Sequence, residues 1–114
     1  MTKENENSII RETVGPGRER RIAHLENLMM VVFDFRDGPM KNPEAPHSHP
    51  HEQITYVAEG ELLFFKGSEE YHLSEGDLIT IPSEIPHSVQ TLTSHVRLVD
   101  SFCPVRNDFL KTNN

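Results

Sequence analysis

Short apolar runs that alternate with turn residues constrain the fold of this chain more than any other feature of its sequence. Runs rich in Val, Ile, Leu and Phe occupy residues 28–35, 54–58, 62–65, 71–73, 78–81, 87–92 and 96–102. None is long and periodic enough to predict a helix. Short strands that recur every 8–12 residues or so are typical of β-sandwiches and β-barrels. The sequence therefore predicts an all-β fold.

The length of the chain predicts a single domain, and its N-terminal composition indicates where that domain begins. A chain of 114 residues can bury one hydrophobic core but has no room for a second domain. Residues 1–11 are polar, and the Gly-Pro-Gly sequence at 15–17 marks the entry to the folded part. We expect a flexible N-terminal segment over residues 1–17 and a β domain over residues 18–114. The charged run at 18–21 is interpreted as a solvated face.

Charge and cysteine content narrow the class of protein. The net charge of −7 argues against nucleic acid and anionic membrane as partners. Cys103 is the single cysteine, so no internal disulfide can form, and a reducing compartment is the simplest environment for it. No apolar stretch has the length of a signal peptide or a membrane span. We therefore expect a cytoplasmic protein.

Closely spaced histidines predict a metal site. Alternate residues of a strand face the same way and each advances by about 3.3 Å, so His47 and His49 would point together, roughly 6.6 Å apart. Two imidazoles at this spacing can share one ion at about 2.0–2.1 Å. Gln53 can reach that ion only if the chain turns back, and Pro50 supplies a break. His87 would have to arrive from another strand.

Two neighbouring residues are alternative ligands. His51 shares the alternation of the other histidines but follows the proline break. Glu52 carries a carboxylate, which binds cations better than an amide does, but its strand parity is opposite to that of the histidines. The four predicted ligands leave coordination positions open, which suits one divalent transition metal such as Ni, Zn, Fe or Mn.

An acidic residue interrupts an apolar strand face near the C-terminus. By the period of two, Asp100 shares a face with Val96, Leu98 and Phe102. Burying a carboxylate without a partner costs several kcal/mol, and desolvation would raise the pKa of Asp100 toward the range useful in acid–base catalysis. The alternative is that Asp100 lies near the strand end and accepts loop N–H bonds.

The two histidine-containing segments resemble the motifs of the cupin superfamily. Residues 47–60 match the first motif, HxHx3–4Ex6G, with Gln53 where the family usually has glutamate. Residues 76–91 match the second, Gx5PxGx2Hx3N, with Glu84 at a glycine position and Thr91 at the asparagine position. The resemblance implies a single-domain, RmlC-like jelly-roll β-barrel that binds a divalent metal.

A narrower resemblance is to the small pectin-degradation cupins of the KdgF family. It is carried by residues 28–32, 47–53, 56–57, 60–61 and 100–110. That family ketonises unsaturated uronates released by pectate and alginate lyases, so the resemblance implies an acidic sugar as substrate. It also implies a site made of two sets of residues: the metal ligands His47, His49, Gln53 and His87, and the catalytic residues Asp100, Phe102 and Arg106.

The exchange of glutamate for glutamine changes the charge of the expected centre. Three neutral imidazoles and an amide leave a divalent ion at about +2, whereas a carboxylate would reduce this to about +1. Such a centre suits an anionic substrate, whose carboxylate Arg106 could bind. The alternative for Arg106 is a surface charge beside Asp108.

Two other classes of function share these motifs. One is a dioxygenase with Fe, Cu or Ni, which also needs open coordination positions. The other is a noncatalytic sugar-binding module or sensor. In each case exposed strand edges give a physical reason to expect a homodimer.

Overall fold

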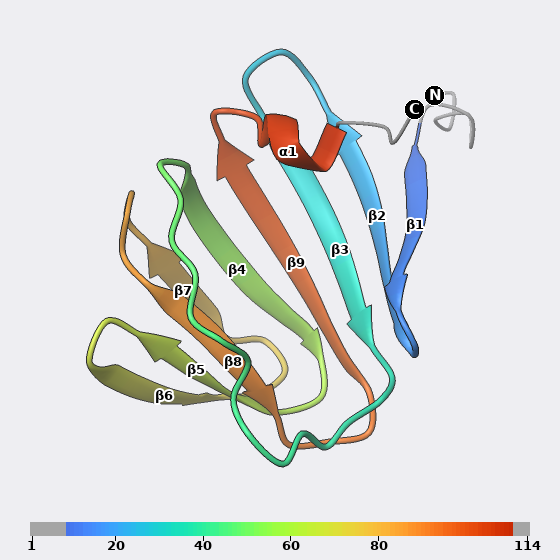
Figure 1. The fold of residues 1–114 in the computed structure, drawn as a ribbon, viewed down its shortest axis with the longest axis vertical. Helices are drawn as coiled ribbons and strands as arrows, with labels where there is room; N and C mark the ends of the chain where they lie inside the picture. Colours follow the sequence, from blue (N-terminus) through green and yellow to red (C-terminus); the bar gives the residue numbers. More distant parts are fainter. Residues whose placement is uncertain (1–8, 111–114) are drawn as a thin grey trace.

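The computed structural model describes residues 9–110, and strands dominate this part of the chain (Figure 1). In chain order the elements are β1 (Ile10–Gly15), β2 (Arg18–His24), β3 (Met29–Phe35), β4 (Glu52–Glu59), β5 (Leu62–Lys66), β6 (Glu69–Leu73), β7 (Leu78–Ile81), β8 (His87–Thr91), β9 (Val96–Cys103) and α1 (Asn107–Leu110). The predicted all-β fold is confirmed. Within residues 9–110, no helix is long and apolar enough to cross a membrane.

The strands form two antiparallel sheets. The larger has the order β1-β2-β3-β9-β4-β7, and the smaller has the order β6-β5-β8. Figure 1 shows the smaller sheet at the end of the larger one that carries β4 and β7. Among the described residues, hydrogen bonds do not join the two into one closed sheet. The prediction of a jelly-roll barrel is therefore confirmed only as far as two antiparallel sheets.

An apolar core lies between the sheets. Phe64 of β5 packs in one buried cluster with Val57 of β4 and Ile81 of β7, and none of the three is more than 1% exposed. A second cluster, which includes Met29 and Phe102, lies under α1 at the other end of the larger sheet. Inward and outward residues alternate along these strands, as the period of two requires.

The charged run at 18–21 is not simply a solvated face, because it begins β2. Arg20 points inward, where its guanidinium lies 4.2 Å from the ring centre of Phe109 and bonds to Glu12 (2.9 Å). Long arginine side chains can cover apolar surface with their stems while the charged head is paired. Residues 1–8 of the predicted flexible segment lie outside the described residues, and Ile10–Gly15 of the same segment forms β1, paired with β2.

The loop between β3 and β4 follows the edge of β8 and positions the histidines. The Glu44 N–H donates to the Val89 carbonyl (2.9 Å). His47 and His87 exchange backbone hydrogen bonds in both directions (3.0 and 2.9 Å), as an isolated antiparallel bridge. Two residues forty positions apart are thereby held side by side.

Candidate metal centre

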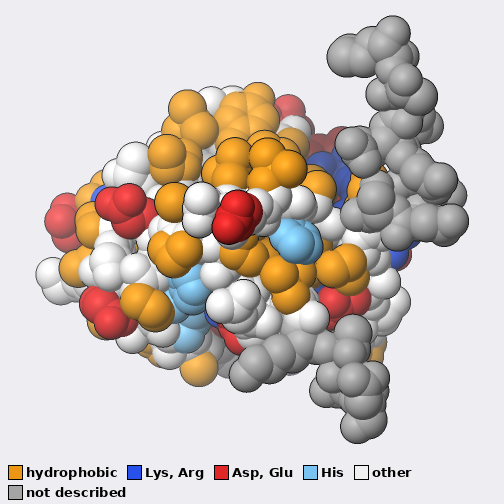
Figure 2. All heavy atoms as spheres, turned by 90° about the horizontal axis from the view of Figure 1, so that it is seen from above, with side chains coloured by type: hydrophobic (Ala, Val, Ile, Leu, Met, Phe, Trp, Pro, Cys, Tyr) orange, Lys and Arg blue, Asp and Glu red, His pale blue; other side chains and the backbone are white. Residues whose placement is uncertain are grey.

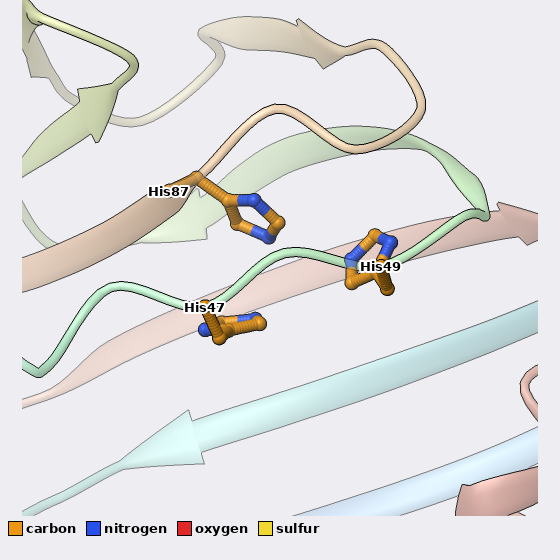
Figure 3. Close-up of side chains that lie close together, drawn as sticks. All are labelled: His47, His49 and His87. Carbon is orange, nitrogen blue, oxygen red and sulfur yellow. The ribbon is translucent and has the colours of Figure 1, made fainter.

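Three histidines converge at the mouth of the space between the sheets. His47 and His49 extend from the loop before β4, and His87 extends from the start of β8 (Figure 3). One nitrogen of each ring lies within 4.8 Å of those of the other two. Ring centres are 4.3 Å apart for His47 and His87, and 4.9 Å apart for His49 and His87. The three histidines therefore converge, as the sequence predicted.

The hydrogen bonds of two rings leave lone pairs aimed into the cluster. Nδ1 of His87 donates to the Ile85 carbonyl and Nδ1 of His49 donates to the His51 carbonyl (2.9 Å each). Each Nε2 is therefore an unprotonated acceptor when the ring is neutral. Burial lowers the pKa of His87 to about 4. Burial, helped by the charge of Arg106, also lowers the pKa of the His47 imidazole.

The position of Gln53 supports a cation in this cluster. Its Oε1 lies 3.1 Å from His49 Nε2, so the chain does turn back as Pro50 predicted. When His49 is neutral, the amide oxygen and the Nε2 lone pair are both acceptors, so a cation between them, either a metal ion or the proton of an imidazolium, stabilises their approach. Nε2 of His87 is buried without a hydrogen-bond partner among residues 9–110. The donor set therefore fits a divalent metal.

The two alternative ligands lie outside the cluster. Glu52 is exposed, on the opposite side of β4 from the buried Gln53. The ring centre of His51 lies 5.4 Å from that of His49, but the group of side chains with mutually close ligand atoms does not contain His51. The parity argument against Glu52 is confirmed.

Asp100 is buried on the inner face of β9. It is 6% exposed, beside Leu98 and Phe102, as the period of two predicted. Asp100 lies in the middle of β9 and not at its end. It accepts a hydrogen bond from the Thr55 hydroxyl of β4 (2.7 Å), so its partner is a side chain of a neighbouring strand and not a loop N–H. Burial raises the pKa of Asp100 to about 6, although Thr55, Arg106 and Gln53 oppose the shift. Such a pKa suits acid–base work near neutral pH.

Arg106 lies beside Asp108, as the alternative predicted, but it is not a surface charge. Its Nη2 and Nε donate to the Asp108 carboxylate (2.7 and 3.3 Å). Partial burial would raise the pKa of Asp108, but the pairing with Arg106 outweighs it and lowers that pKa. The guanidinium also lies over Phe102 and Phe109, 5.2 and 4.0 Å from the ring centres. The side chain is only 13% exposed, so Arg106 is a held group rather than a free surface charge.

One pocket of about 430 Å³ contains most of the predicted site residues. His47, Gln53, His87, Asp100, Phe102 and Arg106 all line it. Other residues of the lining were not predicted as site residues, among them Arg18, Phe33, Phe35, Glu44 and Phe109. Strand parity could have found the two phenylalanines of β3, since both face inward. Figure 2 views the molecule from the end that carries α1 and shows histidine side chains at the surface among hydrophobic ones.

Comparisons with known proteins agree with this geometry. The model of the cupin domain family (Cupin_2) matches residues 32–102. The chain is similar to the pectin degradation protein KdgF of Dickeya dadantii (strain 3937), with 36% identity over 101 residues, which cover 87% of this chain and 89% of the relative.

Two solved structures have the same fold over nearly the whole chain. The structure of KdgF from Halomonas sp. has a TM-score of 0.79 and 32% identity, covering 92% of this chain and 94% of that one. An RmlC-like cupin from Shewanella frigidimarina NCIMB 400 has a TM-score of 0.79 and 29% identity, with 93% of each chain covered.

Proposed function

Because this chain belongs to the cupin family, and within it to the family of pectin degradation protein KdgF, we propose that it is a metal-dependent cupin that ketonises unsaturated uronates from pectin or alginate breakdown. The observation that carries the proposal is that His47, His87, Asp100 and Arg106 line one pocket. That pocket combines lone pairs for a metal, a buried carboxyl group and a fixed cation.

The metal would be held by the three histidines and Gln53. A divalent ion bound there supplies Lewis-acid polarisation of a sugar oxygen. Ring opening removes a proton from a hydroxyl group as the ring C–O bond breaks, and ketonisation adds a proton to carbon. The product is an isomer of the substrate, so one residue that accepts and returns a proton balances the reaction. Asp100 fits this role because it is the buried acid of the pocket.

Arg106 and Phe102 would orient the substrate. A guanidinium has five N–H donors, and the Asp108 contacts use only its Nε and Nη2 sides, so Arg106 has donors left for the uronate carboxylate. Phe102 is 2% exposed and packs edge-on to His49, with ring centres 5.7 Å apart. It would form an apolar wall that excludes water beside the reacting sugar.

The test mixes the protein with the products of a pectate or alginate lyase and follows the ultraviolet absorbance of the conjugated uronate. We expect the absorbance to decay faster than in a control without protein. Asp100→Asn keeps the size of the side chain and an acceptor for Thr55, and we expect it to slow the decay by roughly 10²–10⁴-fold. The exposed Glu52→Gln, next to the site but facing away, should match the wild type.

Each outcome has a separate meaning. Decay no faster than in the control without protein would remove the proposed reaction. An Asp100→Asn variant that is fully active would remove only the assigned base. Uronate binding without turnover, measured by calorimetry, would favour the noncatalytic sugar-binding alternative.

We also propose that the protein is a homodimer joined through the outer face of the larger sheet. Strand register places Val32, Val99, Tyr56 and Leu78 in one row across β3, β9, β4 and β7. Tyr56 and Leu78 are 41% and 64% exposed. Because this row carries no charge, two copies of a chain of net charge −7 can meet there without charge repulsion.

A further inference from the structure

Thr55 joins two groups of the proposed site. It lies on β4 two residues after Gln53, so both side chains face inward, and it is 0% exposed. Its hydroxyl accepts a hydrogen bond from Gln53 Nε2 (2.8 Å) and donates one to Asp100 Oδ1 (2.7 Å). With the Gln53 contact to His49, an unbroken polar chain runs from the histidine cluster to the buried acid.

The direction of these hydrogen bonds follows from the single proton of a hydroxyl group. That proton is given to the Asp100 carboxylate, which has no proton to offer in return, so the Thr55 oxygen is left to accept. Only the NH2 group of the Gln53 amide can donate to it, and the amide oxygen therefore turns toward His49. An amide nitrogen has no available lone pair for a cation, so this orientation decides whether Gln53 can act as a ligand.

We propose that Thr55 is a positioning residue that holds the Gln53 amide with its oxygen toward the three histidines and ties it to the Asp100 side chain. This inference rests on the proposed metal site and goes beyond it, because it assigns the choice of ligand atom to a residue that touches neither metal nor substrate. A threonine that merely filled the core would act in the same way whatever residue stood at position 53.

The first test measures metal affinity. Thr55→Val has nearly the same shape and lacks the hydroxyl, and loss of such a supporting partner typically weakens metal binding by about 10–100-fold. We expect the affinity of Thr55→Val for Zn²⁺, measured by competition with a chromophoric chelator, to fall by this factor. We also expect the absorption spectrum of bound Co²⁺ to change. Thr55→Ser should restore both. Thr91→Val is the matched control, because Thr91 is 0% exposed, its buried Oγ1 has no partner among residues 9–110, and it does not line the pocket.

A double-mutant cycle separates positioning from packing. Gln53→Glu replaces the amide by a carboxylate, whose two oxygens are equivalent, so no orientation remains to be fixed. Adding Thr55→Val to Gln53→Glu should therefore weaken Zn²⁺ binding much less than Thr55→Val does alone. An equal loss in both backgrounds would assign Thr55 a structural role only and overturn the proposal.

The remaining outcomes are distinct. Wild-type Zn²⁺ affinity and an unchanged Co²⁺ spectrum in Thr55→Val would overturn the positioning role and leave the metal site standing. A wild-type protein that binds neither ion would overturn the metal site and this inference together. If Thr55→Val does not fold, nuclear Overhauser contacts in the unmodified protein decide: the Gln53 NH2 protons should contact the Thr55 methyl group, and their absence contradicts the proposal.

Discussion

At the scale of single residues, two glycines with left-handed backbones differ in what surrounds them. Gly60, which ends the first histidine motif, has φ 84°, and a Cβ there would lie 2.2 Å from the His95 carbonyl oxygen. Gly67 has φ 60° and nothing within 4 Å of that position. We predict that Gly60→Ala lowers the free energy of unfolding by about 2–5 kcal/mol, because it adds a backbone clash to the conformational penalty.

Gly67→Ala carries the conformational penalty alone and should cost about 1–2 kcal/mol. Urea denaturation of both variants measures the difference. Equal losses would show that the close approach at Gly60 is relieved by a small backbone shift.

Glu84 shows why motif letters are an incomplete guide to backbone shape. The second cupin motif has glycine at this position, and Glu84 keeps the left-handed conformation that glycine favours (φ 66°). Its N–H donates to the His49 carbonyl (2.8 Å), so the turn still supports a candidate ligand. The departure from the motif leaves the geometry of the site in place.

At the scale of elements, apolar alternation predicted β3 to β9 but not β1 and β2. β2 turns Arg18 and Arg20 toward the interior, and β1 turns Glu12 toward Arg20. Periodicity in hydrophobicity cannot detect a strand whose inward positions are charged. Arg18, for example, lies with its guanidinium 5.4 Å from the ring centre of Phe35 and pairs with Glu44. Such a strand is recognisable only once its neighbours are in place.

The pairing of β3 with β9 carries a pH-sensitive ion cluster on the outer face. Asp34 is 5% exposed and accepts hydrogen bonds from Arg97 (2.8 Å) and from His95 (2.7 Å). Desolvation alone would raise the pKa of Asp34, but these partners outweigh it and hold the pKa below its usual value. A depressed pKa stabilises the folded state above the unfolded pKa of about 3.9, and this stability is lost as pH falls through the folded pKa.

We therefore predict that Asp34→Asn lowers the free energy of unfolding by about 2 kcal/mol at pH 7. The gap between variant and wild type should narrow as the pH falls below about 4. Chemical denaturation at a series of pH values measures it, with the exposed Glu19→Gln as control, since Glu19 is 57% exposed in its contact with Arg36. A gap that is constant with pH would contradict the assigned pKa shift.

At the scale of the whole molecule, histidine spacing predicted which side chains meet, but not the shape of the pocket around them. The loop before β4 has no periodic pattern of apolar residues, and its path beside β8 is set by backbone hydrogen bonds such as the one from Glu44 to Val89. The aromatic side of the pocket also depends on α1, which contributes Phe109 from a four-residue helix. Segments this short carry too little sequence signal to be predicted alone.

The proposed dimer gives a prediction at this scale. Tyr56→Glu places a charge in the middle of the apolar row on the larger sheet, where burial against a partner would be costly. We expect light scattering after size-exclusion chromatography to give a dimer mass for the wild type and a monomer mass for Tyr56→Glu. Glu70→Gln, on the exposed face of β6, should stay dimeric. A monomeric wild type would contradict the proposal.

The central claim is that His47, His49, His87 and Gln53 hold one divalent ion. Crystals grown with Zn²⁺ and measured on both sides of its absorption edge test this claim directly. We expect one anomalous peak per chain, about 2.0–2.1 Å from a nitrogen of each histidine and next to Gln53 Oε1. A peak elsewhere in the molecule, or none at these histidines, would contradict it.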